Sequence, residues 1–342
     1  MKRILILLSL LFVIFTTINT QVIKNSVFCS INICMTSFIP SVFIFMILSS
    51  YIASCESTSI IFKPLGKVFS CLFGTSECSS LPIILGWITG FPIGASCTYE
   101  MYQNGKISKE EAEYLISFCS NSGISFIFGV LGGEIYKNQK TALFLFSIQI
   151  LASAIVGIIM KEKIFSTNSE SQDFPVETNS SYRNLIDCVK KTVINLAYIC
   201  GYIMFFSALT EFFIFFLPNN MDFIAKGFFE LTNACMMLDK IPLKTSLILA
   251  SGLLSWSGVC VHIQVSTVAP GLSLKKYFTG KLIHMALTMS LTAIVPIKQY
   301  INAYKETVTV TYRNNNFGLL FFLIIFAVLC CIFFNNGVKC RK

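Results

Sequence analysis

The stretch ISKEEAEYLISFCSNSGISFIFGV, residues 107 to 130, starts with charged residues, continues as an apolar run and is interrupted by Asn-Ser-Gly at residues 121 to 123. The stretch IPLKTSLILASGLLSWSGVCVHIQV, residues 241 to 265, repeats this order, and its interruption is Trp-Ser-Gly at residues 256 to 258. One inserted residue brings the two stretches into alignment. Two apolar segments with the same unusual interruption indicate an internal repeat.

A second pair of irregular motifs lies upstream of these interruptions, GFPIGA at residues 90 to 95 and ELTNA at residues 230 to 234. The glycines of the first motif follow Gly86 at a spacing of four residues, which exposes bare backbone on one helix face and permits close packing. Pro92 lacks a backbone N–H, so a carbonyl must find a partner in neighbouring protein or in a water-filled cavity. Broken helices at corresponding places in two halves are typical of a transporter's central site. The alternative is that Gly and Pro only kink tightly packed helices.

The composition sets the class of protein. Of 342 residues, 54% are hydrophobic and 13% are charged, whereas soluble domains carry about 25% charged residues. A soluble globular domain and a disordered chain are both excluded. The net charge of +9 comes from lysines and arginines scattered in short groups, which indicates membrane topology and not a nucleic-acid surface. The sequence therefore predicts an all-α polytopic integral membrane protein whose partner is the lipid bilayer and which binds no nucleic acid.

The chain divides into five expected parts. Residues 161 to 191 are Ser-rich and mix acidic with basic residues, so we interpret them as a polar linker. The other parts are an N-terminal transmembrane helix at 1–24, a first repeat at 25–160, a second repeat at 192–300, and a C-terminal transmembrane helix with a basic tail at 301–342. A cleaved signal peptide is the alternative for the first part, but no Ala-x-Ala-like site is present, which favours an uncleaved helix.

The two repeats are expected to be inverted relative to each other. The helix near residues 40–52 is preceded by Lys24 and followed by Lys63 and Lys67, whereas its counterpart near residues 192–210 is preceded by Arg183, Lys190 and Lys191 and followed by Asp222. The basic flanks thus lie in part at opposite ends of corresponding helices, which indicates opposite orientations in the membrane. An inversion needs an odd number of crossings in each half, which a re-entrant first segment at about residues 78 to 100 plus three spans would supply.

The stretch GFPIGASCTYEMYQNGKISKEEAEYLISFCSNSGISFIFGVLG, residues 90 to 132, resembles the signature of the sporulation integral membrane protein YlbJ family. In that family a Gly-aromatic-Pro-x-Gly-Ala motif precedes a Lys/Glu-rich turn, an Asn-containing kink and a Phe-rich helix. In the second half, FFELTNA and SGVCVHIQV resemble the family's Glu-x-Thr-x-Gly and Gly-x-Ser-Val-His-x-Gln-Val elements. Ala234 stands where the family has Gly, and Cys260 where it has Ser. The similarity covers about residues 30 to 300.

The resemblance implies membership of the wider Gate, or nucleoside-recognition, domain group, and hence two gate-like repeats. It also implies a role in endospore formation, in the mother-cell-derived membrane around the forespore. The function we expect is that of a carrier or channel for a small polar solute or ion needed in spore cortex formation or maturation. The alternative is a non-transporting membrane scaffold that binds other sporulation membrane proteins through its linker or through the acidic turn at residues 109–113.

Polar groups at membrane depth form the candidate site, because inserting an ionisable side chain there costs about 2.5 to 3.5 kcal/mol. Glu230 would bind a cation or polar solute, or would cap a helix at the bilayer surface. His262 would belong to the site, or would be a neutral histidine satisfied by a backbone carbonyl. Glu211 and His284 are expected at the membrane interface. The candidate substrate-binding residues are Gly90, Pro92, Gly94, Asn121, Ser122, Gly123, Glu230, Thr232, Asn233, Ser257, Gly258, His262 and Gln264.

Enzyme chemistry is not expected. The sequence contains no phosphate-binding loop, nucleophile elbow or zinc-protease motif, and its few acids show no recognisable pairing. We therefore assign no catalytic residue. With two histidines and no Cys-x-x-Cys pair, we expect no metal site and no cofactor. Most cysteines lie within apolar runs, where they act as small hydrophobic residues.

Overall fold

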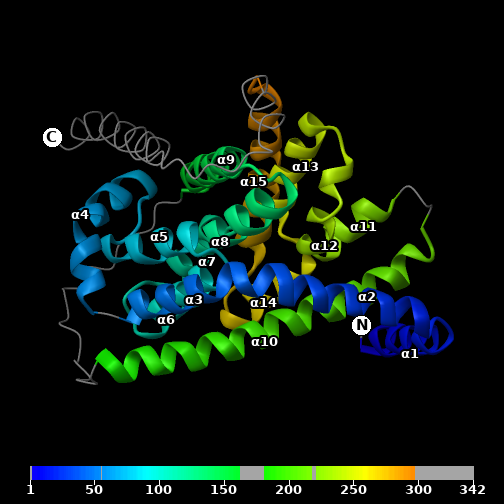
Figure 1. The fold of residues 1–342 in the computed structure, drawn as a ribbon. Helices are drawn as coiled ribbons and strands as arrows, with labels where there is room; N and C mark the ends of the chain where they lie inside the picture. The colour runs from blue at the N-terminus through cyan, green and yellow to red at the C-terminus, as the bar shows by residue number, and fades with distance from the viewer. Residues whose placement is uncertain (1, 55, 162–180, 218–220, 297–342) are drawn as a thin grey trace.

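The computed structural model describes residues 2–54, 56–161, 181–217 and 221–296, and all regular structure in these residues is helical (Figure 1). The helices of the first half are α1 (Lys2–Ile18), α2 (Thr20–Ile33), η1 (Cys34–Phe38), α3 (Ile39–Ser54), α4 (Glu56–Phe73), η2 (Glu77–Ser79), α5 (Ser80–Ile88), α6 (Ile93–Gln103), α7 (Lys109–Cys119), α8 (Ile124–Phe126), η3 (Ile127–Ile135) and α9 (Gln139–Ile159). Those of the second half are α10 (Ser181–Ile214), α11 (Asp222–Phe229), α12 (Leu231–Cys235), η4 (Leu238–Lys240), α13 (Leu243–Trp256), α14 (Gly258–Val268) and α15 (Lys275–Ile294).

The described residues include five segments long and apolar enough to cross a membrane, so the chain is an all-α polytopic membrane protein as expected. These segments are Thr20–Leu48, Lys109–Ile135, Gln139–Ile159, Leu185–Ile214 and Leu243–Val268. A further pair, Pro64–Phe73 with Glu77–Ile88, is bent by 100° and is either a broken span or a re-entrant loop.

Some predicted segment boundaries differ from the ends of the helices. The first helix ends at Ile18, and α2 follows at once from Thr20. Helix α10 begins at Ser181, so the last part of the expected linker is helical. Residues 162–180 of that linker and the expected C-terminal helix in 301–342 lie outside the described residues.

The same order of helices occurs in both halves, in the segments that carry the internal sequence repeat. In the first half, the pair α5–α6 is followed by α7, which breaks before α8 and η3, and then by the long helix α9. In the second half, the pair α11–α12 is followed by α13, which breaks before α14, and then by the long helix α15. Whether the halves are inverted relative to the membrane stays a prediction.

Within each half, the two breaks contact each other. In the first half the backbone N–H of Phe91 donates to the carbonyl of Asn121 at 2.8 Å. Gly90 has φ +79°, and a Cβ atom there would lie 2.3 Å from the nitrogen of Gly123. In the second half Gly258 has φ +82°, and a Cβ atom there would lie 3.0 Å from the carbonyl of Phe229. Glycine is needed at both points because it tolerates positive φ and leaves room for a crossing backbone.

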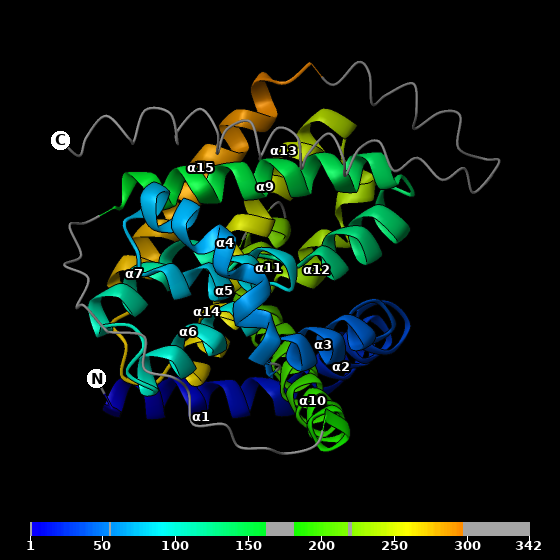
Figure 2. The ribbon, with the colours of Figure 1, turned by 90° about the vertical axis from the view of Figure 1, so that its left-hand side faces the viewer.

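The two halves interlock through their long helices. Figure 2 shows α9, α13 and α15 side by side, and α15 also packs on α7. Ser122, in the first-half break, donates through its hydroxyl to the carbonyl of Leu254 near the end of α13, at 3.0 Å. The backbone N–H of Ser273 donates to Glu113 at 2.8 Å, which joins the halves again. The breaks therefore lie at the junction of the halves.

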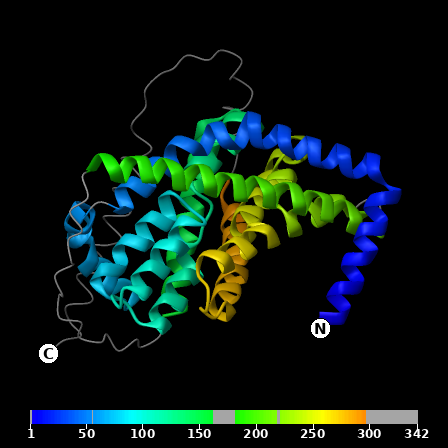
Figure 3. The same ribbon diagram turned by 90° about the horizontal axis from the view of Figure 1, so that it is seen from below.

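Helix α10 lies along α2 and α3 on one side of this core (Figure 3). Its contact with α2 includes a buried hydrogen bond of 2.7 Å between the hydroxyls of Ser30 and Ser207. Near the amino terminus, α1 contacts α10 through edge-to-face pairs of Phe12 and Phe15 with Phe212. This arrangement brings α2 and α10 beside the α11–α12 break.

Candidate functional site

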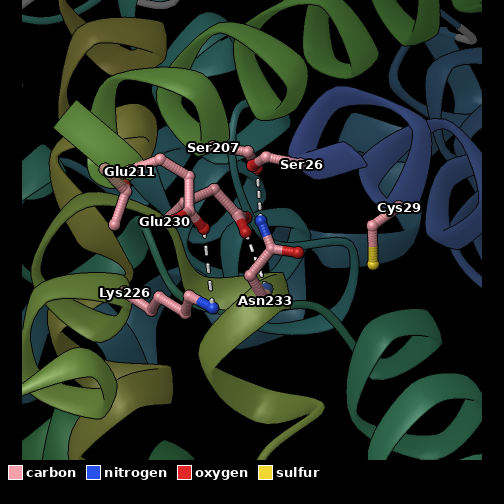
Figure 4. Close-up of a pocket in the computed structure, with 8 residues that line it drawn as sticks. Ser26, Cys29, Ser207, Glu211, Lys226, Glu230 and Asn233 are labelled. Atoms are coloured by element: carbon pink, nitrogen blue, oxygen red, sulfur yellow. Dashed lines mark hydrogen bonds and ion pairs between the residues drawn. The ribbon is translucent and has the colours of Figure 1, made fainter. Parts of the chain in front are cut away.

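A polar pocket lies where α2 and α10 meet the break between α11 and α12 (Figure 4). Its volume is about 70 Å³, and a single water needs about 10 to 15 Å³. The pocket therefore has room for a few waters, an ion or a small molecule. It is lined by Ser26, Cys29, Ser207, Thr210, Glu211, Lys226, Glu230 and Asn233.

Glu230 is the residue between α11 and α12, and it holds the break together. Its backbone is extended, with φ −146° and ψ 124°, so α11 ends there and α12 begins anew. Its two carboxylate oxygens accept the N–H groups of Thr232 at 2.8 Å and Asn233 at 2.7 Å. A carboxylate at this position satisfies two otherwise unpaired amides and is favoured by the helix dipole. Glu230 therefore caps a helix, is only 3% exposed and lines the pocket, and its binding role stays a prediction.

Asn233 connects the break to α10. Its side-chain amide donates to the hydroxyl of Ser207, and Ser207 in turn bonds to Ser30 of α2. The side-chain carbonyl oxygen of Asn233 is not used in these hydrogen bonds. It is an acceptor in the wall of the pocket (Figure 4). The pocket wall therefore offers both donors and acceptors.

Charge in the pocket comes from two carboxylates and one ammonium. Lys226 lies 3.8 Å from Glu211, and their side chains are 29% and 22% exposed. Glu211 was expected at the membrane interface, and the structure places it in this partly exposed pair. A partly exposed ion pair contributes little to the stability of the protein, so a ligand can compete for either group. Together with Glu230, the lining favours a cation or a small solute that carries both donors and acceptors.

The other candidate residues of the first half form the packed contact between its breaks. Asn121 donates to the carbonyl of Phe118 and to Ser153, both at 2.9 Å. Gly94, like Gly86, faces the backbone of Cys119 at distances that leave no room for a side chain. Pro92 follows Phe91 through a cis peptide bond and begins α6.

The remaining candidates of the second half lie beside its break and away from the pocket. Ser257 has φ +69° and lies at the break between α13 and α14. His262 shares a hydrogen bond of 2.8 Å with the hydroxyl of Tyr277, and its Nε2 atom is buried without a partner. Gln264 donates to the sulfur of Cys260 at 3.4 Å, while its Oε1 atom is also buried and unpaired. The pocket thus gathers Glu230 and Asn233, and the binding roles of the other candidates stay predictions.

His284 is buried within the protein, and its expected position at the membrane interface stays a prediction. It lies within α15 and is 2% exposed, and its Nε2 atom is 3.0 Å from the carbonyl of Gln149 in α9. The expected position assumed a helix start near Lys281. Helix α15 instead begins at Lys275, and Lys281 is itself buried.

Glu111 is a structural carboxylate that sequence reasoning missed. It is 2% exposed and accepts hydrogen bonds from the N–H of Ser76 at 2.6 Å, from the Ser76 hydroxyl at 2.8 Å and from the Ser79 hydroxyl at 2.7 Å. It lies in the acidic turn that the scaffold alternative treats as a docking surface. Two acids of that turn, Glu111 and Glu113, are already engaged inside this chain.

Replacing Glu111 by alanine is expected to lower the free energy of unfolding by about 3 kcal/mol, because buried donors lose a charged acceptor. Glu110 is the neighbouring exposed acid, and Glu110→Ala should change stability by less than about 0.5 kcal/mol. An SDS titration of the two purified variants measures the difference. Equal stability of both variants would contradict the structural role of Glu111.

Among the described residues, no cluster of three His, Cys, Asp or Glu side chains has the arrangement of a metal site.

The chain is 24% identical over 286 residues to the Sporulation integral membrane protein YlbJ of Bacillus subtilis (strain 168), and the match covers 71% of this chain and 70% of that protein. No family model matches the chain. No solved structure matches it. With the membrane-crossing helices described above, the chain is a multi-pass integral membrane protein similar to YlbJ, and the family resemblance expected from its motifs is confirmed.

Proposed function

We propose that the protein is a carrier or channel for a small polar solute or ion used in spore cortex formation or maturation. The observation that supports this function is the polar pocket at the α11–α12 break. Irregular backbone in a membrane protein is tolerated where it is buried in protein or lines a cavity. Here a broken helix pair does line a cavity, and charged and hydroxyl side chains face into it.

The size of the pocket narrows the class of solute. Its volume of about 70 Å³ is well below the roughly 300 to 1,000 Å³ of pockets for drug-sized ligands. Two carboxylates against one ammonium favour a cation or a small molecule with a protonated amine. Hydroxyl and amide groups of Ser207 and Asn233 would orient its polar atoms.

The meeting of the two halves gives the pocket a means of opening. The α11–α12 break contacts Gly258 at the α13–α14 break, and Ser122 ties the first-half break to Leu254 of α13. A shift of one half against the other would therefore move the α11–α12 break, which lines the pocket. Such relative movement of repeats around a fixed site is the usual basis of alternating access.

The similarity to a sporulation integral membrane protein supports a role in sporulation. We further propose a location in the mother-cell-derived membrane around the forespore, with other sporulation membrane proteins as partners. In this proposal the protein catalyses no reaction, uses no cofactor and binds no nucleic acid.

Blocking the pocket tests this function. Ser26 lines the pocket, and Ser26→Phe should reduce the yield of heat-resistant spores in the native host several-fold, because the ring fills the space for the solute. Ser147 is a half-buried serine of α9 outside the pocket, so Ser147→Phe is the matched control. Membrane abundance of both variants is measured by immunoblot.

Normal spores from Ser26→Phe at normal abundance would contradict the carrier proposal. A scaffold would be favoured if that variant gave normal spores and if replacing residues 166–182 by an inert linker abolished the pull-down of other sporulation membrane proteins.

A further inference from the structure

Lys281 is a buried cation in the middle of the molecule. Its side chain belongs to α15, and the residue is 1% exposed. No ion pair joins it to a carboxylate in the described residues, where the ion pairs found include Lys109 with Glu113 and Lys226 with Glu211. A buried ammonium without a counterion is costly, and burial lowers the pKa of Lys281 to about 7, so its charged form depends on other groups that stabilise it.

The carboxyl end of α7 supplies that stabilisation. Helix α7 ends at Cys119, and Ser120 is its last cap residue. The ammonium of Lys281 donates to the carbonyl of Ser120, at the end of the helix where the backbone carbonyls carry partial negative charge. The centroid of the Tyr277 ring, one turn earlier on α15, lies 5.8 Å from the same ammonium and adds a weaker attraction.

A second oxygen at this point is unpaired. The hydroxyl of Ser120 is buried and has no hydrogen-bond partner, although its own carbonyl accepts from Lys281. On α9, both polar atoms of the Gln149 side chain are buried and unpaired as well, and the carbonyl of Gln149 contacts His284, one turn along α15 from Lys281. The Lys281 ammonium therefore bonds to the Ser120 carbonyl, and the unpaired hydroxyl belongs to the same residue.

We propose that the carboxyl end of α7, with the carbonyl and hydroxyl of Ser120, is a monovalent-cation site that this chain fills with its own Lys281 ammonium. Carbonyl ends of broken helices commonly hold exchangeable cations in membrane carriers. Here the cation is covalently attached, so this site needs no sodium or potassium ion. The site is distinct from the α11–α12 pocket and does not depend on the proposed transport function.

The fixed charge has a structural consequence at the junction of the halves. Ser120 begins the break that also contains Ser122, and the hydroxyl of Ser122 bonds to Leu254 in the second half. Gly280, next to Lys281, lies against the carbonyl of Ser117, where a Cβ atom would come within 2.4 Å. The Lys281 ammonium therefore holds the first-half break in place against α15.

Chemical rescue of Lys281→Ala tests this site. The substitution removes the atoms of a propylammonium ion, so the probe is propylammonium chloride added to the purified full-length variant in sodium-free choline buffer. The melting temperature of Lys281→Ala should fall below that of the wild type, and propylammonium should restore most of the loss. Sodium chloride should give a smaller rise through the oxygens of Ser120. Lys275→Ala, at an exposed position of the same helix, should show neither the fall nor the rise.

Two further measurements separate charge from space filling. An equal concentration of 1-propanol should not restore the melting temperature of Lys281→Ala. Lys281→Met, which keeps the length and removes the charge, should be less stable than the wild type. The proposal is overturned by rescue with 1-propanol equal to that with propylammonium, by Lys281→Met as stable as the wild type, or by a Lys281→Ala protein that cannot be purified even with propylammonium present.

Discussion

Gly86→Ala is expected to prevent stable accumulation of the folded protein. A Cβ atom at Gly86 would lie 1.8 Å from the carbonyl oxygen of Cys119, and that oxygen belongs to the backbone at the end of α7. Neither helix can move away easily, because Gly94 packs against the same carbonyl. Overpacking in a close-packed interior typically costs about 1 to 3 kcal/mol, and backbone contacts this short exceed that range.

Gly201 provides the matched control for this glycine. It also lies within a helix, α10, but a Cβ atom there would meet no other atom within 4 Å. Gly201→Ala should keep or slightly raise stability, since alanine favours helix. Membrane abundance and the melting temperature in detergent distinguish the two variants. Gly86→Ala protein with the melting temperature of Gly201→Ala would mean that α5 and α7 are not packed as described.

Glu230→Gln is expected to weaken solute binding about tenfold, the change that corresponds to losing about 1.4 kcal/mol of interaction, and thereby to reduce the yield of heat-resistant spores. Glutamine can still accept one of the two N–H groups that Glu230 now accepts, so α12 stays capped in part. The negative charge facing the pocket is lost. Glu230→Ala should do the same and should also destabilise the protein by about 1 to 2 kcal/mol through the missing cap.

Asp239→Asn is the control for charge removal in the same region, because Asp239 is exposed and does not line the pocket. Spore counts after heating and immunoblots of membranes give the two readouts. Normal spore counts with Glu230→Gln at normal abundance would show that the Glu230 charge serves only the cap.

Much of the fold could be predicted because short sequence motifs mark the breaks in its helices. Gly90, Ser257 and Gly258 take positive φ at the points where the two motifs interrupt apolar runs. A helix cap was one of the two roles that the sequence predicted for Glu230, and Glu230 is the N-cap of α12. The alignment of the two halves could be seen since both interruptions occur in the same order.

The composition of the pocket could not be predicted from these patterns. Ser26 and Ser207 come from α2 and α10, which are far apart in the sequence and carry no motif. Their role depends on how two long helices cross the α11–α12 break, and hydrophobic periodicity does not fix such a crossing. Sequence reasoning therefore found only the residues of the pocket that lie on the break.

Lys281 was missed for a different reason. A lysine before an apolar window normally marks the membrane surface, and this rule does not predict a contact between the ammonium and the carbonyl of a distant helix end. The contact with Ser120 joins residues from opposite halves. No local signal in α15 indicates it.

The most direct measurement of the central claim is solute uptake by the purified wild-type protein in liposomes, alongside Ser26→Phe. The panel consists of sodium, potassium, small amino acids, polyamines and nucleosides as radiolabelled tracers. We expect uptake of at least one small cation or amine-bearing solute above that of empty liposomes, and its loss in Ser26→Phe. Equal uptake of every tracer in empty, wild-type and Ser26→Phe liposomes would contradict the carrier function.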